Sequence, residues 1–294
     1  MRVSVSEIRR QCKRSEQEEV KIFFKKAREF YRTASREGEE LYDRAFDLTS
    51  EFQKIHARTM QQNPRIIKIL RYLLVPAISQ MKLGQMVGIS STVGIEDGGK
   101  LGPDLSAKLA TLFRSNLDHS RFIWQQTRMG SKAQALAKLY AKKWTVSLMA
   151  NQNATTVFRN WRKDLQENKV ERAIMEASYR LLPVRPLVRA IATIPPGGFV
   201  KESKLGRRSP QKADFVIRTR NGRRLIALEA KAIGVKIDAY KRIKEVRDKA
   251  AAWRRLFGDR IRTGTVIAGF IPVGEVETLL DGGIPFFWEH AFPA

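Results

Sequence analysis

The chain has 294 residues, and among them are only one cysteine, Cys12, and three histidines. A single cysteine excludes an internal disulfide and a cysteine-rich zinc site. The histidines, His56, His119 and His290, are far apart and do not have the spacing of metal ligands. The sequence also lacks a signal peptide and an apolar run long enough to cross a bilayer. We therefore expect a cytoplasmic protein that does not enter a membrane.

The sequence also has few acidic residues relative to basic ones. The chain has 30 Asp and Glu against 55 Lys and Arg, which gives a net charge of +25. Such an excess attracts polyanions, and nucleic acid is the commonest polyanionic partner of a basic protein. A solvated basic surface without a partner and an anionic membrane surface are the alternatives. Hydrophobic residues make up 43% of the chain, which excludes a disordered tail.

The first half of the chain shows helical periodicity. Apolar residues between Val20 and Tyr31 recur at helical spacing, which predicts a core-facing stripe on a helix from about residue 1 to 58. Further helices are expected at about 64–72, 76–87, 104–126 and 131–151 and from about 155, with a Gly- and Ser-rich loop at 88–103. Trp124, Trp144 and Trp161 lie in apolar helical patterns and are expected in the core. We assign residues 1–154 to a helical region for DNA recognition and dimerisation.

The pattern changes near Pro183, where prolines and glycines become frequent and β-rich segments follow. Residues 213–218, 224–230 and 265–271 read as strands, and 236–257 reads as an amphipathic helix that stops at Gly258. The sequence therefore predicts a mixed α/β fold, with a core over residues 155–294 behind a largely helical N-terminal half.

A hairpin between two of these strands carries the candidate chemistry. Asn221-Gly222 predicts a two-residue type I′ turn, in which the numbers of facing residues sum to 443. Asp214 and Glu229 obey this rule, so their Cβ atoms are expected roughly 4.5–5.5 Å apart on one face. Lys231 lies two residues after Glu229 and shares that face. A β-bulge would shift this register.

Two facing carboxylates repel each other, and a divalent cation such as Mg²⁺ would offset the repulsion. The neighbouring lysine would then assist an attacking water or stabilise charge on a phosphate. This arrangement favours metal-assisted phosphodiester hydrolysis with Asp214, Glu229 and Lys231 as catalytic residues. The alternative is a solvated strand face with a surface ion pair. The apolar run 225–228 and the basic helix that follows favour the catalytic interpretation.

The spacing of Asp214, Glu229 and Lys231 is similar to the PD-(D/E)XK nuclease signature, although Ala213 stands where proline is frequent. The chain more closely resembles the XamI-like type II restriction endonucleases. The segments that carry this resemblance are 228–232, 241–245, 268–270 and 283–290, with a further block at 64–90. Within that block Gln80 and Met81 stand where the family pattern has arginine and aspartate.

The resemblance implies a PD-(D/E)XK core, Mg²⁺, and cleavage of both strands of double-stranded DNA at a short palindromic site by a homodimer. It also implies that Glu171 is an auxiliary acid near the metal. The alternative is that Glu171 is only an exposed charge on a helix. Basic residues are expected to hold phosphates, namely Lys204, Arg207 and Arg208 in a loop and Lys236, Lys241, Arg242 and Lys244 on the following helix. A nuclease for branched, damaged or transposon DNA and a non-catalytic DNA-binding protein remain open as alternatives.

Overall fold

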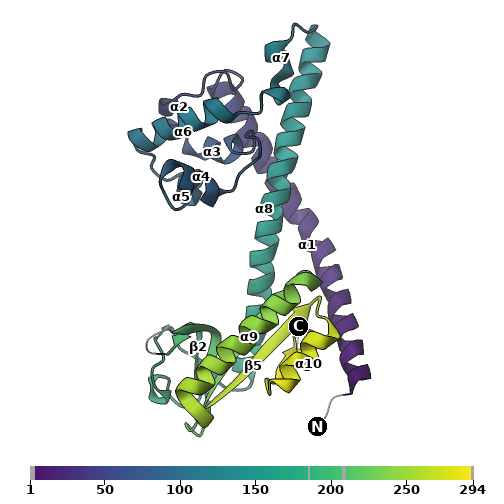
Figure 1. Cartoon of the computed structure of the whole chain (residues 1–294), viewed down its shortest axis with the longest axis vertical. Coiled ribbons are helices and arrows are strands. Elements are labelled where there is room, and N and C mark those ends of the chain that lie inside the picture. The colour runs from purple at the N-terminus through teal and green to yellow at the C-terminus, as the bar shows by residue number, and fades with distance from the viewer. Residues whose placement is uncertain (1–3, 185, 207–209, 293–294) are drawn as a thin grey trace. The chain divides into compact units, whose positions relative to one another are not determined.

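The computed structural model describes residues 4–184, 186–206 and 210–292 (Figure 1). The chain divides into two compact units. The helical unit is Lys26–Val157, and the sheet unit combines the chain up to Lys25 with the chain from Phe158 onward. Two long helices, α1 (Val5–Leu48) and α8 (Ser131–Glu176), contribute residues to both units.

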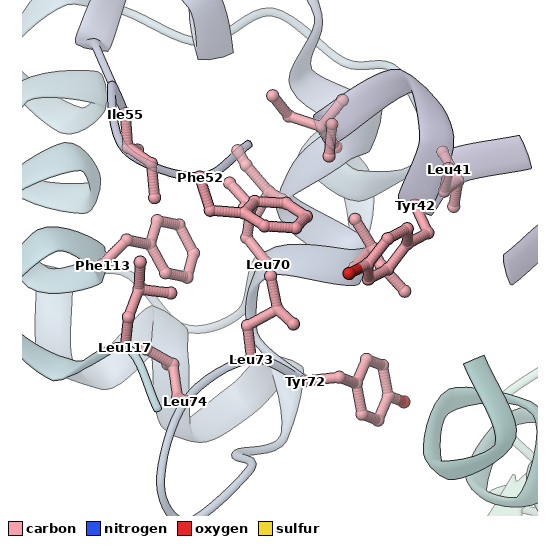
Figure 2. Close-up of a cluster of buried hydrophobic side chains, with 14 of the residues drawn as sticks. Leu41, Tyr42, Phe52, Ile55, Leu70, Tyr72, Leu73, Leu74, Phe113 and Leu117 are labelled. Atoms are coloured by element: carbon pink, nitrogen blue, oxygen red, sulfur yellow. The ribbon is translucent and has the colours of Figure 1, made fainter. Parts of the chain in front are cut away.

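The helical unit is a set of short helices with a shared apolar core. Between α1 and α8 lie α2 (Ala57–Gln62), η1 (Pro64–Ile66), α3 (Ile67–Leu70), α4 (Gln80–Val87), α5 (Val93–Glu96), α6 (Pro103–Asn116), η2 (His119–Phe122) and α7 (Ile123–Gln126). Figure 2 shows Phe52, Leu70 and Phe113 pointing into the core, and all three are buried. The core therefore joins segments from the end of α1, the middle of the unit and α6.

A buried ion pair fastens α4 and α5 to this core. The Arg71 Nε atom donates to Glu96 Oε2 at 3.2 Å, and Gln80 Nε2 donates to the same oxygen at 2.9 Å. Thr92 Oγ1 donates to the other oxygen, Oε1, at 2.6 Å. A buried carboxylate is tolerated when its oxygens are hydrogen-bonded in this way. Gln80, which departs from the family pattern in sequence, thus takes part in holding Glu96.

The sheet unit contains a six-stranded mixed sheet with the strands in sequence order. Its elements are β1 (Arg180–Leu181), η3 (Ile191–Thr193), β2 (Gly198–Leu205), β3 (Gln211–Arg218), β4 (Leu225–Ile233), α9 (Lys236–Phe257), η4 (Gly258–Arg260), β5 (Ile261–Gly269), α10 (Val273–Asp281), β6 (Phe286–Trp288) and η5 (Glu289–Ala291). Strands β2, β3 and β4 pair antiparallel, and the other pairs are parallel. The predicted mixed α/β fold with a helical N-terminal half is confirmed.

Helices cover the central strands on both faces. Val216 and Ala227 pack with Trp253 of α9, whereas Phe215 and Leu228 pack with Val170 of α8. The alternation along β3 and β4 follows the two-residue period of a strand, so each face buries every second side chain. Asp214 of β3 and Glu229 of β4 are buried between these layers.

Several predicted element boundaries are wrong. The two helices expected at 131–151 and from 155 are one 46-residue helix, because this segment contains no glycine or proline to stop it. The helix expected to reach residue 126 ends at Asn116, where Leu117 turns to an extended conformation. It is capped by Gly102 and not by Asp104. The predicted loop 88–103 contains α5.

Three further expectations fail. Lys204, expected in a loop, lies in strand β2. The expected core stripe on the first helix is not buried, since Phe24 is 70% exposed and Phe23 is 45% exposed. Trp144, also expected in the core, is 68% exposed. Helical spacing alone therefore does not identify which apolar face finds a partner.

Candidate active site

The hairpin of β3 and β4 has the predicted register but not the predicted turn. Phe215 faces Leu228 and Arg218 faces Leu225, so facing numbers sum to 443. The Gly222 N–H donates to the Thr219 carbonyl at 2.8 Å, and of this fully described loop only Gly222 has a positive φ, 69°. A type I′ turn needs two such residues. The connection is therefore a four-residue loop over 220–223 with the same midpoint, which preserves the register.

Asp214 lies in β3 directly before Phe215, the first residue of this strand that pairs with β4, and is 8% exposed. Its Oδ2 atom accepts a hydrogen bond from the Ala230 N–H at 2.8 Å. Ala230 separates Glu229 from Lys231 in β4, so the Asp214 carboxylate lies beside the strand that carries both other residues. The hydrogen bond from the backbone amide fixes the position of this carboxylate oxygen.

Glu229 is completely buried and carries two ion pairs. Its Oε2 atom lies 2.9 Å from the Lys231 Nζ and 2.8 Å from the Nζ of Lys249 on α9. Its other oxygen, Oε1, is buried without a hydrogen-bond partner among the described residues. Two ammonium groups offset the cost of burying one carboxylate, yet they leave one oxygen free to accept a ligand.

Glu171, the predicted auxiliary acid, is on α8 and pairs with Lys201 of β2 at 2.6 Å. Glu167, one helical turn earlier, is the acid that sequence reasoning missed. It is 6% exposed, and its Oε1 atom forms an ion pair with the Lys163 Nζ at 3.3 Å. Burial raises the pKa of Glu167, and the nearby negative charge of Asp214 adds to the rise against the opposing charge of Lys163. The sequence signal that could have identified Glu167 is its position four residues, about one helical turn, before Glu171.

The donor set is suited to a hard cation. Mg²⁺ prefers oxygen ligands and commonly takes only one or two protein carboxylates, with water and substrate phosphate completing its shell. Asp214 and Glu229 supply buried carboxylates, and the Glu229 Oε1 atom is unpartnered. Within the described residues, no group of three His, Cys, Asp or Glu side chains is arranged to hold a metal. A cation here would therefore depend on the two carboxylates and on the substrate.

The predicted phosphate-binding residues lie mostly on the surface of the sheet unit. Lys204, Lys241 and Lys244 are exposed. Lys236 pairs with Glu16 at 3.3 Å, and Arg242 pairs with Glu245 at 3.3 Å. The predicted pair Arg207 and Arg208 lies outside the described residues.

Comparison with known families decides the membership of the chain. Residues 50–288 match the XamI restriction endonuclease family. The chain belongs to this family. The match covers both the helical block with Arg71 and Gln80 and the strands with Asp214 and Glu229. Membership of the XamI family implies a nuclease that acts on DNA.

Other comparisons add little to this assignment. No curated protein matches the chain. Among solved structures, the crystal structure of protein VC1899 from Vibrio cholerae matches with 14% identity and a TM-score of 0.27. The match covers 89% of this chain, which spans about half (53%) of that protein's length. A TM-score this low does not establish a shared fold. No helix in the described part of the chain combines the length and apolarity that a membrane span requires.

Proposed function

We propose that this XamI family member is a type II restriction endonuclease that hydrolyses both strands of double-stranded DNA at a short palindromic site with Mg²⁺. The observation that carries the proposal is the arrangement around Glu229. A completely buried carboxylate with one unpartnered oxygen lies beside Lys231, and Asp214 is anchored to the backbone between them. A solvated strand face, the alternative interpretation, does not account for this burial.

The topology supports a PD-(D/E)XK core. The antiparallel strands β2, β3 and β4 are followed by α9, which crosses over to β5 parallel to β4. Asp214 lies on the second of these strands, and Glu229 and Lys231 lie on the third. In the PD-(D/E)XK signature the acids and the lysine come from two neighbouring strands in this same order.

Each residue has a proposed task. Asp214 and Glu229 hold the cation, which when bound polarises the scissile phosphate and lowers the pKa of a water. Lys231 places its Nζ atom 2.9 Å from Glu229, where it orients the attacking water and neutralises charge that develops on the phosphate. Glu167, next to Asp214, and Glu171 are auxiliary acids. The exposed lysines Lys204, Lys241 and Lys244 hold the DNA backbone, together with Lys236, Arg207, Arg208 and Arg242.

The protein is expected to act as a homodimer, because a two-fold symmetric target is matched by a two-fold symmetric protein. Residues 1–154 are expected to contribute to DNA recognition and dimerisation, and 155–294 to form the nuclease core. The helical unit, Lys26–Val157, contains most of the first range, whereas the chain up to Lys25 belongs to the sheet unit with the second range.

Digestion of a large sequenced DNA with Mg²⁺, followed by sequencing of the fragment ends, tests the function. Wild type should give discrete fragments whose ends share one short symmetric sequence. Chelator should abolish the product, and Lys231→Ala should abolish it while DNA binding is retained. Lys108→Ala, which removes the same charge from an exposed lysine of α6, serves as the matched control. Intact plain duplex together with cleaved branched DNA would favour a different nuclease task, and no cleavage of any substrate would overturn the proposal.

A further inference from the structure

Lys163 of α8 contacts two acids at once beside the candidate cation site. Its Nζ atom forms an ion pair with Glu167 Oε1 at 3.3 Å and donates a hydrogen bond to Glu202 Oε1 of β2 at 3.4 Å. Lys212 of β3 donates a further hydrogen bond to the same Glu202 oxygen at 2.8 Å. The Lys163 ammonium is thus shared between a buried acid and an acid that has a second cation.

Glu167 is the acid of this pair that lies toward the cation site. Val170, on the same helix, packs with Phe215, the residue directly after Asp214. Burial raises the pKa of Glu167, and two charges act on it, since Lys163 lowers this pKa and Asp214 raises it further. A divalent cation at Asp214 would therefore compete with the Lys163 ammonium for the Glu167 carboxylate.

The backbone of Glu202 is strained in a way that brings its side chain to Lys163. Within the described strands, Glu202 is the only residue other than glycine with a positive φ, 49°. Val200, two residues earlier, packs with Trp253 of α9, so regular alternation would turn Glu202 toward α9 as well. Glu202 instead contacts Lys163 of α8. Strain of this kind is frequent at functional sites, and a plain surface ion pair does not require it.

We propose that Lys163 is a gate of the cation site and that Glu202 is the positioning residue that receives it. Without a divalent cation, the Lys163 ammonium neutralises Glu167. A cation bound at Asp214 and Glu229 replaces that charge, and Lys163 then moves fully to Glu202. The Glu167 carboxylate becomes available to the cation. The inference rests on the proposed function, because it needs a divalent cation at this site.

The transfer of Lys163 needs little rearrangement. Its side chain is 52% exposed and has room to move. Both oxygens that it contacts are already within hydrogen-bonding reach of the same Nζ atom, so rotation near the end of the side chain is sufficient. Lys212 keeps Glu202 in place whether or not Lys163 has moved.

Calorimetric titration of the full-length protein with Mg²⁺ alone, without DNA, tests the gate. Lys163→Met should lower the Kd for Mg²⁺ about threefold or more, because no ammonium then competes for Glu167. Glu202→Gln should raise the Kd about threefold or more, because Lys163 then keeps Glu167 as its only carboxylate of the pair. Melting curves establish that each variant is folded, and Lys163→Gln replaces Lys163→Met if the latter does not fold.

The double variant separates a gate from a general effect of charge. In a gate, Glu202 acts on Glu167 only through Lys163, so the variant with both substitutions should bind Mg²⁺ as Lys163→Met does. Independent charge effects would add and return the double variant to the wild-type Kd. Arg159→Met and Glu176→Gln make the same charge changes at exposed positions of α8 and should leave the Kd within about twofold of wild type.

Two kinds of failure are distinguishable. Additive effects in the double variant, or a wild-type Kd in Lys163→Met, would overturn the inference. Either result would leave the nuclease proposal intact, because that proposal is tested by Mg²⁺-dependent fragments. If wild type and every variant bind no Mg²⁺ and cut no DNA, the proposed function and the gate both fall.

Discussion

Lys249 of α9 and Glu229 of β4 form an ion pair in which the Lys249 Nζ lies 2.8 Å from the Glu229 Oε2. The second cation on this oxygen, Lys231, comes from the strand itself. Helix α9, which follows strand β4, thus places a lysine in contact with the buried carboxylate of that strand. Lys249 is therefore expected to hold the Glu229 side chain in place while no divalent cation is bound.

Lys249→Met should lower the free energy of unfolding by about 1–3 kcal/mol without Mg²⁺, because the buried carboxylate keeps only Lys231 as its cation. Adding Mg²⁺ should restore part of the loss, since a bound cation stabilises the folded state. Urea unfolding with and without Mg²⁺ measures both effects. Lys241→Met, exposed on the same helix, is the control and should change little. Equal unfolding free energies for the two variants would contradict the assigned role.

Asp214→Asn should abolish the heat of Mg²⁺ binding in calorimetry, because the amide keeps an acceptor for the Ala230 N–H but supplies no negative charge. The fold should survive for the same reason. The control is Asp238→Asn, an exposed aspartate in the first turn of α9. Unchanged Mg²⁺ binding by Asp214→Asn would remove this residue from the cation site.

Arg162 holds two buried glutamates of the sheet unit. Its Nε atom donates to Glu19 and its Nη2 atom donates to Glu289, both at 2.8 Å. Burial raises the pKa of Glu19, and the charge of Arg162 opposes that rise. Arg162→Met should lower the free energy of unfolding by about 3–5 kcal/mol at neutral pH, because two carboxylates lose their shared cation.

This loss of unfolding free energy should shrink as the pH falls and Glu19, whose pKa is raised, becomes protonated. Chemical denaturation at pH 7 and pH 5 measures the trend. Arg159→Met, an exposed arginine one turn earlier on α8, should be nearly neutral. A pH-independent loss would point to packing of the arginine stem as its cause.

Glu202 of β2 accepts from Lys212 at 2.8 Å, and Lys163 lies 3.4 Å away. These contacts, with the Lys212 hydrogen bond as the largest, lower the pKa of Glu202 to about 2. Because the pKa of Glu202 is lower in the folded protein than its ordinary value of 4.5, the ionised carboxylate stabilises the fold above pH 4.5. This stabilisation is lost as the pH falls toward 2.

Glu202→Gln should therefore lower the stability of the fold at pH 7. The difference in stability between this variant and wild type should narrow between about pH 5 and pH 3. Thermal melts across that range give the profile. Glu176→Gln, at an exposed position at the end of α8, is the comparison. A difference that stays constant down to pH 3 would show that the Lys212 contact does not shift the titration.

Local sequence determined much of the sheet unit. Alternating apolar residues on either side of Asn221-Gly222 were enough to give the β3–β4 register, because a side chain changes face with every residue. The turn type was mistaken, yet a loop with the same midpoint leaves the pairing unchanged. Helix α9 has the predicted bounds, since its apolar period and the stop at Gly258 are both local signals.

Tertiary structure decided which remote segments meet. Lys249 is twenty residues from Glu229 in sequence, and no local pattern distinguishes it from the other lysines of α9. Ser15 of α1 accepts a hydrogen bond from the Gly269 N–H at 2.8 Å, a contact between the two ends of the chain. Propensity and periodicity act over a few residues, whereas such contacts depend on which apolar faces pack. The sequence therefore determined the strand that carries Glu229 and Lys231, and packing alone brought Lys249 to the same carboxylate.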